Sequence, residues 1–233
     1  MNTSPAARPC RIALPGRHVD VVPLNPEVHT DALWKAVAGF DDVWTYLFDG
    51  PYADRETFRA ALEKRVQTDD PLCFAIVDRM TGLAAGYAAY MRIEPAHRVI
   101  EVGNILFTPA LQRTAGATEA MYLMARHVFE DLGYRRYEWK CNALNAPSRC
   151  AALRLGFTFE GIFRQHMIVK GKNRDTAWFS MLDSEWPLRR AAFEQWLEPA
   201  NFDENGHQRK RLSELMSAAK EREQSGLGSP QRL

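Results

Sequence analysis

A loop of small residues at 111–117 offers the clearest binding chemistry in the chain. It reads Leu-Gln-Arg-Thr-Ala-Gly-Ala and joins an apolar stretch, 99–107, to a helical pattern. The N–H groups of such a loop and of the first helical turn lack partners, and the helix dipole favours negative charge there. Thr118 and Glu119 fall in that turn, where a carboxylate suits the dipole. The pattern predicts a pyrophosphate site, although a tight turn without a ligand would look the same.

Glu101 is the candidate for proton transfer. It is the only charged residue in 99–107, and so apolar a strand is usually buried on both faces. Burial raises the pKa of a carboxylate, which suits a base that takes a proton from an ammonium group through water. Two alternatives stay open: a structural carboxylate paired with an arginine, or one that points into solvent.

A well-specified helix follows the loop. Met121, Met124, Val128 and Leu132 recur at spacings of three and four, which puts them on one face. Gly133 then supplies the left-handed residue that ends many helices. We therefore expect a strand, a small-residue loop and a helix to hold the two candidate groups in place.

Further motifs follow a second apolar strand at 137–141. Their order is Gln112-x-x-Ala115-x-Ala117-Thr118-Glu119-Ala120, then Asn145-x-x-Ser148, Gly156-Phe157, Glu160-Gly161 and Arg164. In this order they resemble the GNAT superfamily of acetyl-CoA-dependent N-acetyltransferases, and within it the ribosomal-protein N-terminal acetyltransferase branch. The resemblance covers roughly residues 10 to 187. It rests on several motifs together, because no single one is specific.

The resemblance implies an α/β (α+β) GNAT fold. Its central sheet is mixed, mostly antiparallel and of about seven strands, with a splayed parallel pair and flanking helices. The Gly103-Asn104 pair interrupts the apolar strand and predicts a bulge, and in the family a bulge here separates the two parallel strands. Backbone amides from Asn104 to Phe107 would then bond the pantetheine arm and the acetyl oxygen.

The resemblance also implies the residues that bind acetyl-CoA as acyl donor. They are Leu106, Phe107, Gln112, Arg113, Thr114, Ala115, Gly116, Ala117, Thr118, Asn145 and Arg149. Arg113 and Arg149 are expected to meet phosphates, with a solvated surface position as the alternative for both. Ala115 replaces the family's glycine, which would strain the loop only if this position needs a positive φ.

A second departure concerns the proton donor for the departing thiolate. Most GNAT enzymes place a tyrosine seven residues after the asparagine of the fourth helix, and Ala152 stands there in this chain. Ser148 matches the serine that has this role in the resembled branch, which makes Glu101 and Ser148 the two catalytic candidates. Alternatively, Ser148 is a first-turn residue hydrogen-bonded back to Asn145, and the two roles are compatible.

The last predicted hairpin carries the polar residues Arg164, His166, Arg174, Asp175 and Trp178. The resemblance implies that the arginines and Asp175 lock the hairpin to the core and border the acceptor cleft. A structural role is expected for Arg174 with Asp175. His166 either titrates near neutrality or, as a lone strand histidine, is simply packed or exposed, and the second role is the more common one.

Composition limits the class of protein. With 233 residues, 46% apolar and 25% charged, the chain can bury one good core, and its net charge of +1 gives no case for nucleic acid or an anionic membrane. The four cysteines show no C-x-x-C pair or metal-ligand spacing, so we expect reduced thiols, no metal and a cytoplasmic location. No stretch has the length of a membrane span.

The rest of the chain predicts ordinary elements. They are a strand at 18–24, a helix from a Thr30 cap to Gly39, an aromatic run at 40–52, a helix capped by Asp54, strands at 72–77 and 83–93, a hairpin at 158–169 and 174–182, and a helix at 188–197. The aromatic run is expected mainly in the core, with some rings beside a ligand cleft.

Three segments are predicted: a flexible N-terminus at 1–10, an N-acetyltransferase domain at 11–187, and a helical extension at 188–233. The extension is expected to end in a disordered tail from Gln224 to Leu233. Whether the extension packs on the domain, forms a homodimer or has no role stays open.

The first functional hypothesis is an N-acetyltransferase that moves an acetyl group from acetyl-CoA to a primary amine by direct transfer. The amine belongs either to a protein or peptide N-terminus or to a small molecule. The alternative is a coenzyme A-binding module with impaired turnover, motivated by Ala115 and Ala152. A nucleotide-binding α/β domain ranks last, because the loop lacks Gly-Lys-Ser/Thr and Gly-x-Gly-x-x-Gly.

Overall fold

A single mixed sheet forms the centre of the computed structural model, which describes residues 4–227. In that part of the chain the sheet has eight strands in the order β1-β2-β3-β4-β5-β6-β8-β7. The strands are β1 Leu14–Pro15, β2 Val19–Pro23, β3 Leu72–Asp78, β4 Ala84–Glu94, β5 Val99–Phe107, β6 Arg136–Asn142, β7 Thr158–Val169 and β8 Lys172–Leu182. Among these eight strands of the described chain, the β5–β6 pair alone is parallel. The predicted fold class is confirmed, with the two-residue β1 as an additional strand.

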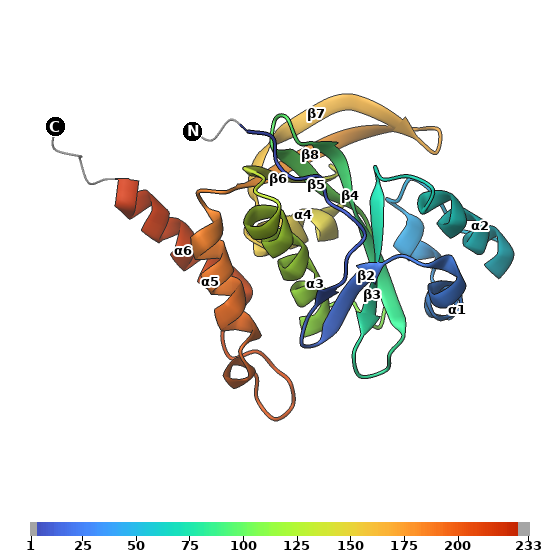
Figure 1. The fold of residues 1–233 in the computed structure, drawn as a ribbon, viewed down its shortest axis with the longest axis horizontal. Coiled ribbons are helices and arrows are strands. Elements are labelled where there is room, and N and C mark those ends of the chain that lie inside the picture. Colours follow the sequence, from blue (N-terminus) through green and yellow to red (C-terminus); the bar gives the residue numbers. More distant parts are fainter. Residues whose placement is uncertain (1–3, 228–233) are drawn as a thin grey trace.

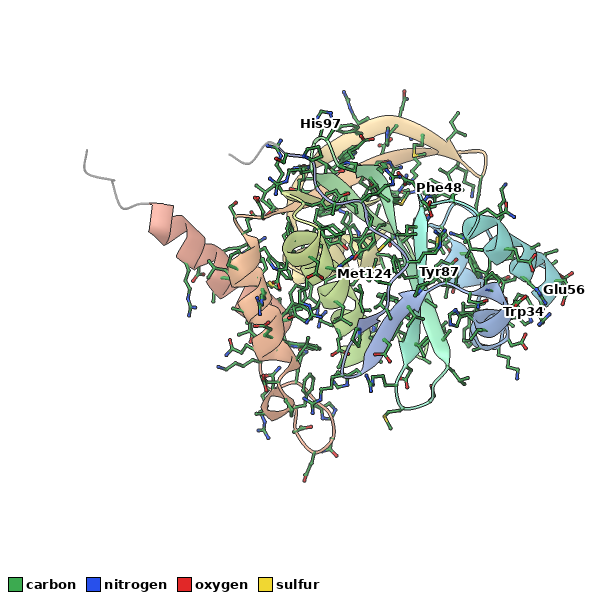
Figure 2. The ribbon with its side chains drawn as sticks, viewed as in Figure 1. Trp34, Phe48, Glu56, Tyr87, His97 and Met124 are labelled. Atoms are coloured by element: carbon green, nitrogen blue, oxygen red, sulfur yellow. The ribbon has the colours of Figure 1, made fainter. Side chains whose placement is uncertain are left out.

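Helices cover both faces of the sheet (Figure 1). They are α1 Pro26–Val37, α2 Arg55–Arg65, α3 Ala115–Arg126, α4 Ala146–Arg154, α5 Trp186–Leu197 and α6 Leu212–Leu227, with short turns at η1 Asp41–Trp44, η2 His127–Asp131 and η3 Pro199–Asn201. Two apolar clusters result. Tyr87 belongs to the cluster under α1 and α2, and Met124 belongs to the one between the sheet, α3 and α5 (Figure 2). None of the described helices combines the length and apolarity of a membrane span.

The parallel strands separate halfway along their length. β5 and β6 pair only from Val99 with Arg136 to Val102 with Trp139, although both strands continue. On the other side of β5, Ala89 pairs with Gly103 and Tyr87 with Leu106, so the register shifts at Asn104. The bulge predicted at Gly103-Asn104 is therefore present. Its left-handed residue is Asn104, with φ +48°, rather than the glycine.

The turn into α3 has its left-handed residue at Arg113, with φ +62°. Thr114 is the N-cap, and its Oγ1 accepts a hydrogen bond from the N–H of Ala117 at 3.1 Å. Ala115 is already helical and carries no left-handed strain, so alanine replaces glycine here without a backbone penalty. At the other end, Gly133 has the predicted left-handed conformation, with φ +70°.

Glu119 is expected in the first turn of α3, but the helix begins at Ala115 and its first turn contains no acidic residue, so Glu119 lies in the second turn. Its carboxylate accepts hydrogen bonds from the backbone N–H groups of Arg17, His18 and Val19 at 2.6–2.9 Å. These bonds tie the β1–β2 turn to the start of α3. The carboxylate is thereby already engaged by the backbone of this turn.

The predicted start of the first helix is wrong. α1 begins at Pro26, and its cap is Asn25, whose Oδ1 accepts from the N–H of Glu27 at 3.0 Å. Thr30 lies inside the helix and donates its hydroxyl hydrogen to the Pro26 carbonyl at 2.5 Å. The Asn-Pro pair looks like a strand stop, but proline at the first helical position after an asparagine is equally a helix start.

Segments near both ends of the described chain pack on the domain. The N–H groups of Ala6 and Ala7 donate to the carbonyls of Pro95 and Leu132 at 3.0 and 3.1 Å, which ties down part of the segment expected to be flexible. At the other end, α5 joins the α3 core through contacts such as the 5.5 Å between the rings of Tyr122 and Phe193. Of the tail expected to be disordered, residues 224–227 belong to α6 and 228–233 lie outside the described residues.

Candidate active site

A large cleft opens where β5 and β6 separate. It has a volume of about 2440 Å³ and is bordered by the ends of both strands, the loop before α3 and the first turn of α4. A single drug-sized ligand needs only about 300–1,000 Å³. The cleft therefore has room for two substrates side by side.

Most of the residues predicted to bind the cosubstrate line this cleft. They are Leu106, Phe107, Gln112, Arg113, Thr114, Ala115, Ala117, Thr118 and Asn145, together with the catalytic candidate Ser148. Gln112 is fixed by a hydrogen bond from its Nε2 to the Phe107 carbonyl at 2.9 Å. The loop and the opened strands therefore face one space.

Two predicted side-chain positions do not face the cleft. A Cβ added at Gly116 would lie 2.8 Å from Cγ1 of Val19, so this position packs against β2. Arg149 points back toward its own loop and donates from Nη1 to the Ala143 carbonyl at 3.3 Å. Its expected contact with a phosphate is not supported by this orientation.

Glu101 is buried, with 2% of its surface exposed. Its Oε2 pairs with Nη1 of Arg92 at 2.7 Å and with Nζ of Lys140 at 2.8 Å. Burial raises the pKa of Glu101 above its ordinary value, and the two cations offset only part of that rise. Both expected properties coexist: the carboxylate is desolvated and it is paired with an arginine.

A small side pocket next to the cleft contains Glu101. It has a volume of about 30 Å³ and is lined by Glu101, Arg92 and His166 along with Asn104 and Arg174, which also line the cleft. One water needs about 10–15 Å³ by this measure. The side pocket therefore has room for a water beside Glu101.

Ser148 has both arrangements that the sequence leaves open. Its N–H donates to Oδ1 of Asn145 at 3.0 Å, which caps α4. Its Oγ accepts a hydrogen bond from Nε1 of Trp139 at 3.0 Å. Because the indole occupies one lone pair of the oxygen, the hydroxyl hydrogen is directed elsewhere, and the Cys141 thiol beside it is one group that it can meet.

Residues 19–158 match the family model of the acetyltransferase (GNAT) domain. The chain belongs to the GNAT acetyltransferase family. It is similar to a GCN5-related N-acetyltransferase from Brucella melitensis, with 50% identity over 93% of this chain and 99% of that one and a TM-score of 0.91. A GNAT-family protein from Chromobacterium violaceum is 42% identical over 78% of this chain and 92% of that one, with a TM-score of 0.75.

The ribosomal L7/L12 alpha-N-protein acetyltransferase shares the fold at a greater distance. It is 20% identical over 73% of this chain and 94% of that one, with a TM-score of 0.62. A search of the curated proteins found none that matches. The resemblance stated from the motifs is thus confirmed for the family, and the enzyme class is N-acetyltransferase.

Arg154 is a residue of this GNAT cleft that the sequence reasoning missed. It lines the cleft, donates from Nη1 to Oγ1 of Thr118 at 3.0 Å, and lies 5.0 Å from the ring of Trp196. Burial lowers its pKa. A helical spacing would have found it, because Pro147, Ala151 and Arg154 follow each other by four and three on the cleft face of α4.

The C-terminal extension also borders the cleft. Trp196 of α5 lines it, as do Arg209 and Arg211 from the segment before α6. No sequence motif assigns these residues to the GNAT domain. They reach the cleft because α5 packs against α3, the helix whose first turn forms the loop end of the site.

The position of the missing tyrosine is part of the core. Ala152 is fully buried and belongs to the cluster between the sheet and α3. A tyrosine on this backbone would need its ring to displace core side chains. The packing around α4 therefore leaves room for alanine at position 152 and not for the tyrosine that is usual in the family.

The last hairpin is held by Asp175 rather than by an Arg174–Asp175 pair. Oδ1 of Asp175 accepts from the N–H of Gln165 at 2.7 Å and from Nδ2 of Asn173 at 3.0 Å. His166 is exposed, and its Nδ1 lies 2.9 Å from Oγ1 of Thr176. Arg164 is exposed, whereas Arg174 is buried and lines the cleft.

The aromatic run at 40–52 divides between the two expected places. Trp44 is buried and packs edge-on to Tyr52, with ring centroids 5.2 Å apart. Phe40, Tyr46 and Phe48 line the cleft. Phe48 lies beneath the β7–β8 hairpin, at the end of the cleft that contains the side pocket (Figure 2).

No group of three or more histidine, cysteine, aspartate or glutamate side chains is placed to hold a metal ion in residues 4–227. The four cysteines, Cys10, Cys73, Cys141 and Cys150, are free thiols. The family chemistry of acyl transfer to an amine needs groups that bind, orient and move protons. The cleft and its side pocket have polar groups of these kinds on β5 with Glu101, on α4 with Ser148, and in the loop before α3.

Proposed function

We propose that this GNAT chain transfers an acetyl group from acetyl-CoA directly to a primary amine. The observation that carries the proposal is the meeting of the α3 loop, the opened β5–β6 pair, Ser148 and the Glu101 side pocket in one cleft. The acceptor is a protein or peptide N-terminus or an amine-bearing small molecule. The four free thiols support a reducing compartment, the cytoplasm.

The start of α3 suits the diphosphate of the cosubstrate. The Thr114 side chain takes the N–H of Ala117, so the N–H groups of Ala115 and Gly116 have no partner within the helix. Arg113 lies in the loop before α3 and Arg154 donates to Thr118 in the first turn of that helix, so both add positive charge near its start. Backbone donors and guanidinium groups are what a phosphate needs.

The opened strands suit the thioester arm. Beyond Val102, the β5 amides that point toward β6 have no partner in that strand. Such amides can bond the extended pantetheine chain as an added strand, and one of them can face the acetyl oxygen. Negative charge that develops on that oxygen during transfer would be stabilised by a fixed backbone dipole.

Glu101 is proposed as the base and Ser148 as the acid. A desolvated carboxylate with a raised pKa can accept the ammonium proton through the side pocket, which leaves a neutral amine to attack the thioester. The Ser148 hydroxyl, oriented by Trp139, can donate its hydrogen to the departing thiolate. Both groups act on atoms held in the cleft.

Ser148→Ala is expected to slow transfer by about 100-fold, the usual scale for loss of a positioned general acid. Acetyl-CoA affinity should change much less, because the Asn145 cap bonds the backbone N–H and survives the change. Single-turnover kinetics and equilibrium binding measure the two effects. Ser184→Ala, on the exposed turn before α5, is the control. Equal losses of rate and affinity would make Ser148 a binding residue only.

The function itself is tested by thiol release from acetyl-CoA over a panel of amines. Release that depends on an added amine, with the acetylated amine found by mass spectrometry, is the expected result. The alternative function is a coenzyme A-binding module with impaired turnover, favoured by Ala152 in place of the usual tyrosine. Tight binding of acetyl-CoA without release for any amine would favour that module.

A further inference from the structure

Arg174 is a buried cation with almost no partners of its own. Only 6% of its surface is exposed. In the described part of the chain its one hydrogen bond goes from Nη1 to the thioether sulfur of Met167 at 3.0 Å, and its Nε has no partner. Burial of a guanidinium group without an acceptor is costly, and it lowers the pKa of Arg174.

The carboxylates nearby are already committed to other cations. An ion-pair chain runs Arg92–Glu101–Lys140–Glu138–Arg136–Glu160, with contacts of 2.5–2.8 Å. Its three positive and three negative groups balance. Arg174 stands outside this chain, so it adds an uncompensated positive charge beside a neutral network.

The Arg174 side chain lies at the boundary between the cleft and the side pocket. It lines the cleft and also the side pocket that contains Glu101, and its guanidinium carbon lies 4.9 Å from the ring centroid of Phe48. The α3 loop borders the cleft but not the side pocket. Arg174 is therefore grouped with the proposed base and not with the expected diphosphate site.

We propose that Arg174 binds a carboxylate of the acceptor, so that the substrates are amines with a carboxylate a few bonds from the nitrogen. This inference rests on the proposed function. The planar fork of a guanidinium matches a carboxylate, and the negative charge of Glu101 in the same side pocket disfavours a doubly charged phosphate more than a monoanion. A free amino acid and the acidic N-terminus of a peptide share this chemistry.

A binding experiment tests the inference without turnover. The probes are acetylated amino acids with one, two or three methylene groups between nitrogen and carboxyl, each beside its neutral amide. Calorimetry on the coenzyme A complex is expected to show at least one acid that binds roughly tenfold or more tightly than its amide, the scale of a charged hydrogen bond. Equal affinity within every pair, or no binding of any acid, would overturn the inference.

Three variants assign that preference to Arg174. Arg174→Gln should remove it, Arg174→Lys should keep part of it, and Arg164→Gln on the exposed face of the same hairpin should leave it intact. Melting temperatures and coenzyme A affinities of the variants show whether the fold is retained. A preference that survives in a folded Arg174→Gln would overturn the assignment.

Turnover measurements distinguish a free amino acid from a protein N-terminus as the acceptor. They also distinguish the carboxylate preference from acetyl transfer itself. Peptide amides that begin Ser-Glu or Ser-Gln are compared with free amino acids and their amides, at equal concentrations of neutral amine. A higher kcat/KM for the Ser-Glu peptide than for the Ser-Gln peptide indicates that the acceptor is a protein N-terminus. A higher kcat/KM for a free amino acid than for its amide indicates that the acceptor is a metabolite. Equal rates for acid and amide would overturn the inference but leave the proposed function standing. Coenzyme A binding without release from any amine counts against the function instead.

Discussion

Glu101→Gln is expected to lower turnover by about 1,000-fold at neutral pH, within the usual range for loss of a general base. The amide keeps the size of the side chain but cannot accept the ammonium proton. Acetyl-CoA affinity should change little, because Glu101 lines the side pocket and not the main cleft. Steady-state kinetics with isothermal titration of coenzyme A measure both quantities.

The pH profile gives the same prediction an independent check. Because burial raises the pKa of Glu101, its base form is lost as the pH falls through that raised value. The acid limb of kcat should therefore lie above the pH at which an exposed glutamate titrates, and Glu101→Gln should lack this limb. Unchanged turnover in the variant would remove Glu101 from the mechanism.

Glu138→Gln is the matched control for Glu101→Gln. Glu138 is also buried and also pairs with Lys140, at 2.7 Å, but it lines neither the cleft nor the side pocket. Removing either carboxylate leaves a buried cation underpaired and costs stability. A loss of turnover that appears in both variants to the same extent would indicate destabilisation rather than loss of a base.

Ala115→Glu is expected to weaken acetyl-CoA binding by roughly 100-fold relative to Ala115→Gln. Two like charges about 5 Å apart repel by about 3 kcal/mol at an effective dielectric near 20, which corresponds to that factor. Ala115 begins α3 and lines the cleft, so the new carboxylate would stand at the expected diphosphate position. The glutamine variant has the same shape without the charge.

Salt strengthens the test of Ala115→Glu, because screening should reduce the difference between the two variants as ionic strength rises. The N-terminal position also predicts that the carboxylate itself stabilises α3 slightly. A loss of affinity with a raised melting temperature would therefore be the clearest result. If both variants bind acetyl-CoA equally, the diphosphate does not lie at the start of α3.

The central strand was predictable because its signals are local. The apolar run and its Thr-Pro end set the bounds of β5 from Val99 to Phe107, which match the expectation. The start of α1 was not predictable from the sequence. The pair Asn25-Pro26 can either end a strand or begin a helix, and only the surrounding chain decides between them. β1 is two residues long, too short for any alternation to appear.

The candidate site also has one part that the sequence predicts and another that depends on the assembled sheet. Burial of Glu101 follows from the strand around it, but its partners Arg92 and Lys140 come from neighbouring strands and depend on register. That register includes an irregularity between Met91 and Glu94, which no sequence pattern specifies. The Nε of Arg174 has no hydrogen-bond partner because the neighbouring carboxylates pair with other cations. That pairing is a property of the assembled sheet and not of any local sequence pattern.

The attachment of α5 to α3 sets a practical limit on recombinant fragments of this protein. A fragment that ends at Pro187 looks complete by its motifs, yet it lacks Phe193 and Trp196, which cover Tyr122 and Arg154. Burial of a large apolar side chain contributes roughly 1.5–3 kcal/mol, and the fragment loses this contribution for Phe193 and Trp196, both of which are buried. Such a shortened product would expose apolar side chains of α3 to solvent, so recombinant fragments for crystallisation and screening should extend beyond Trp196.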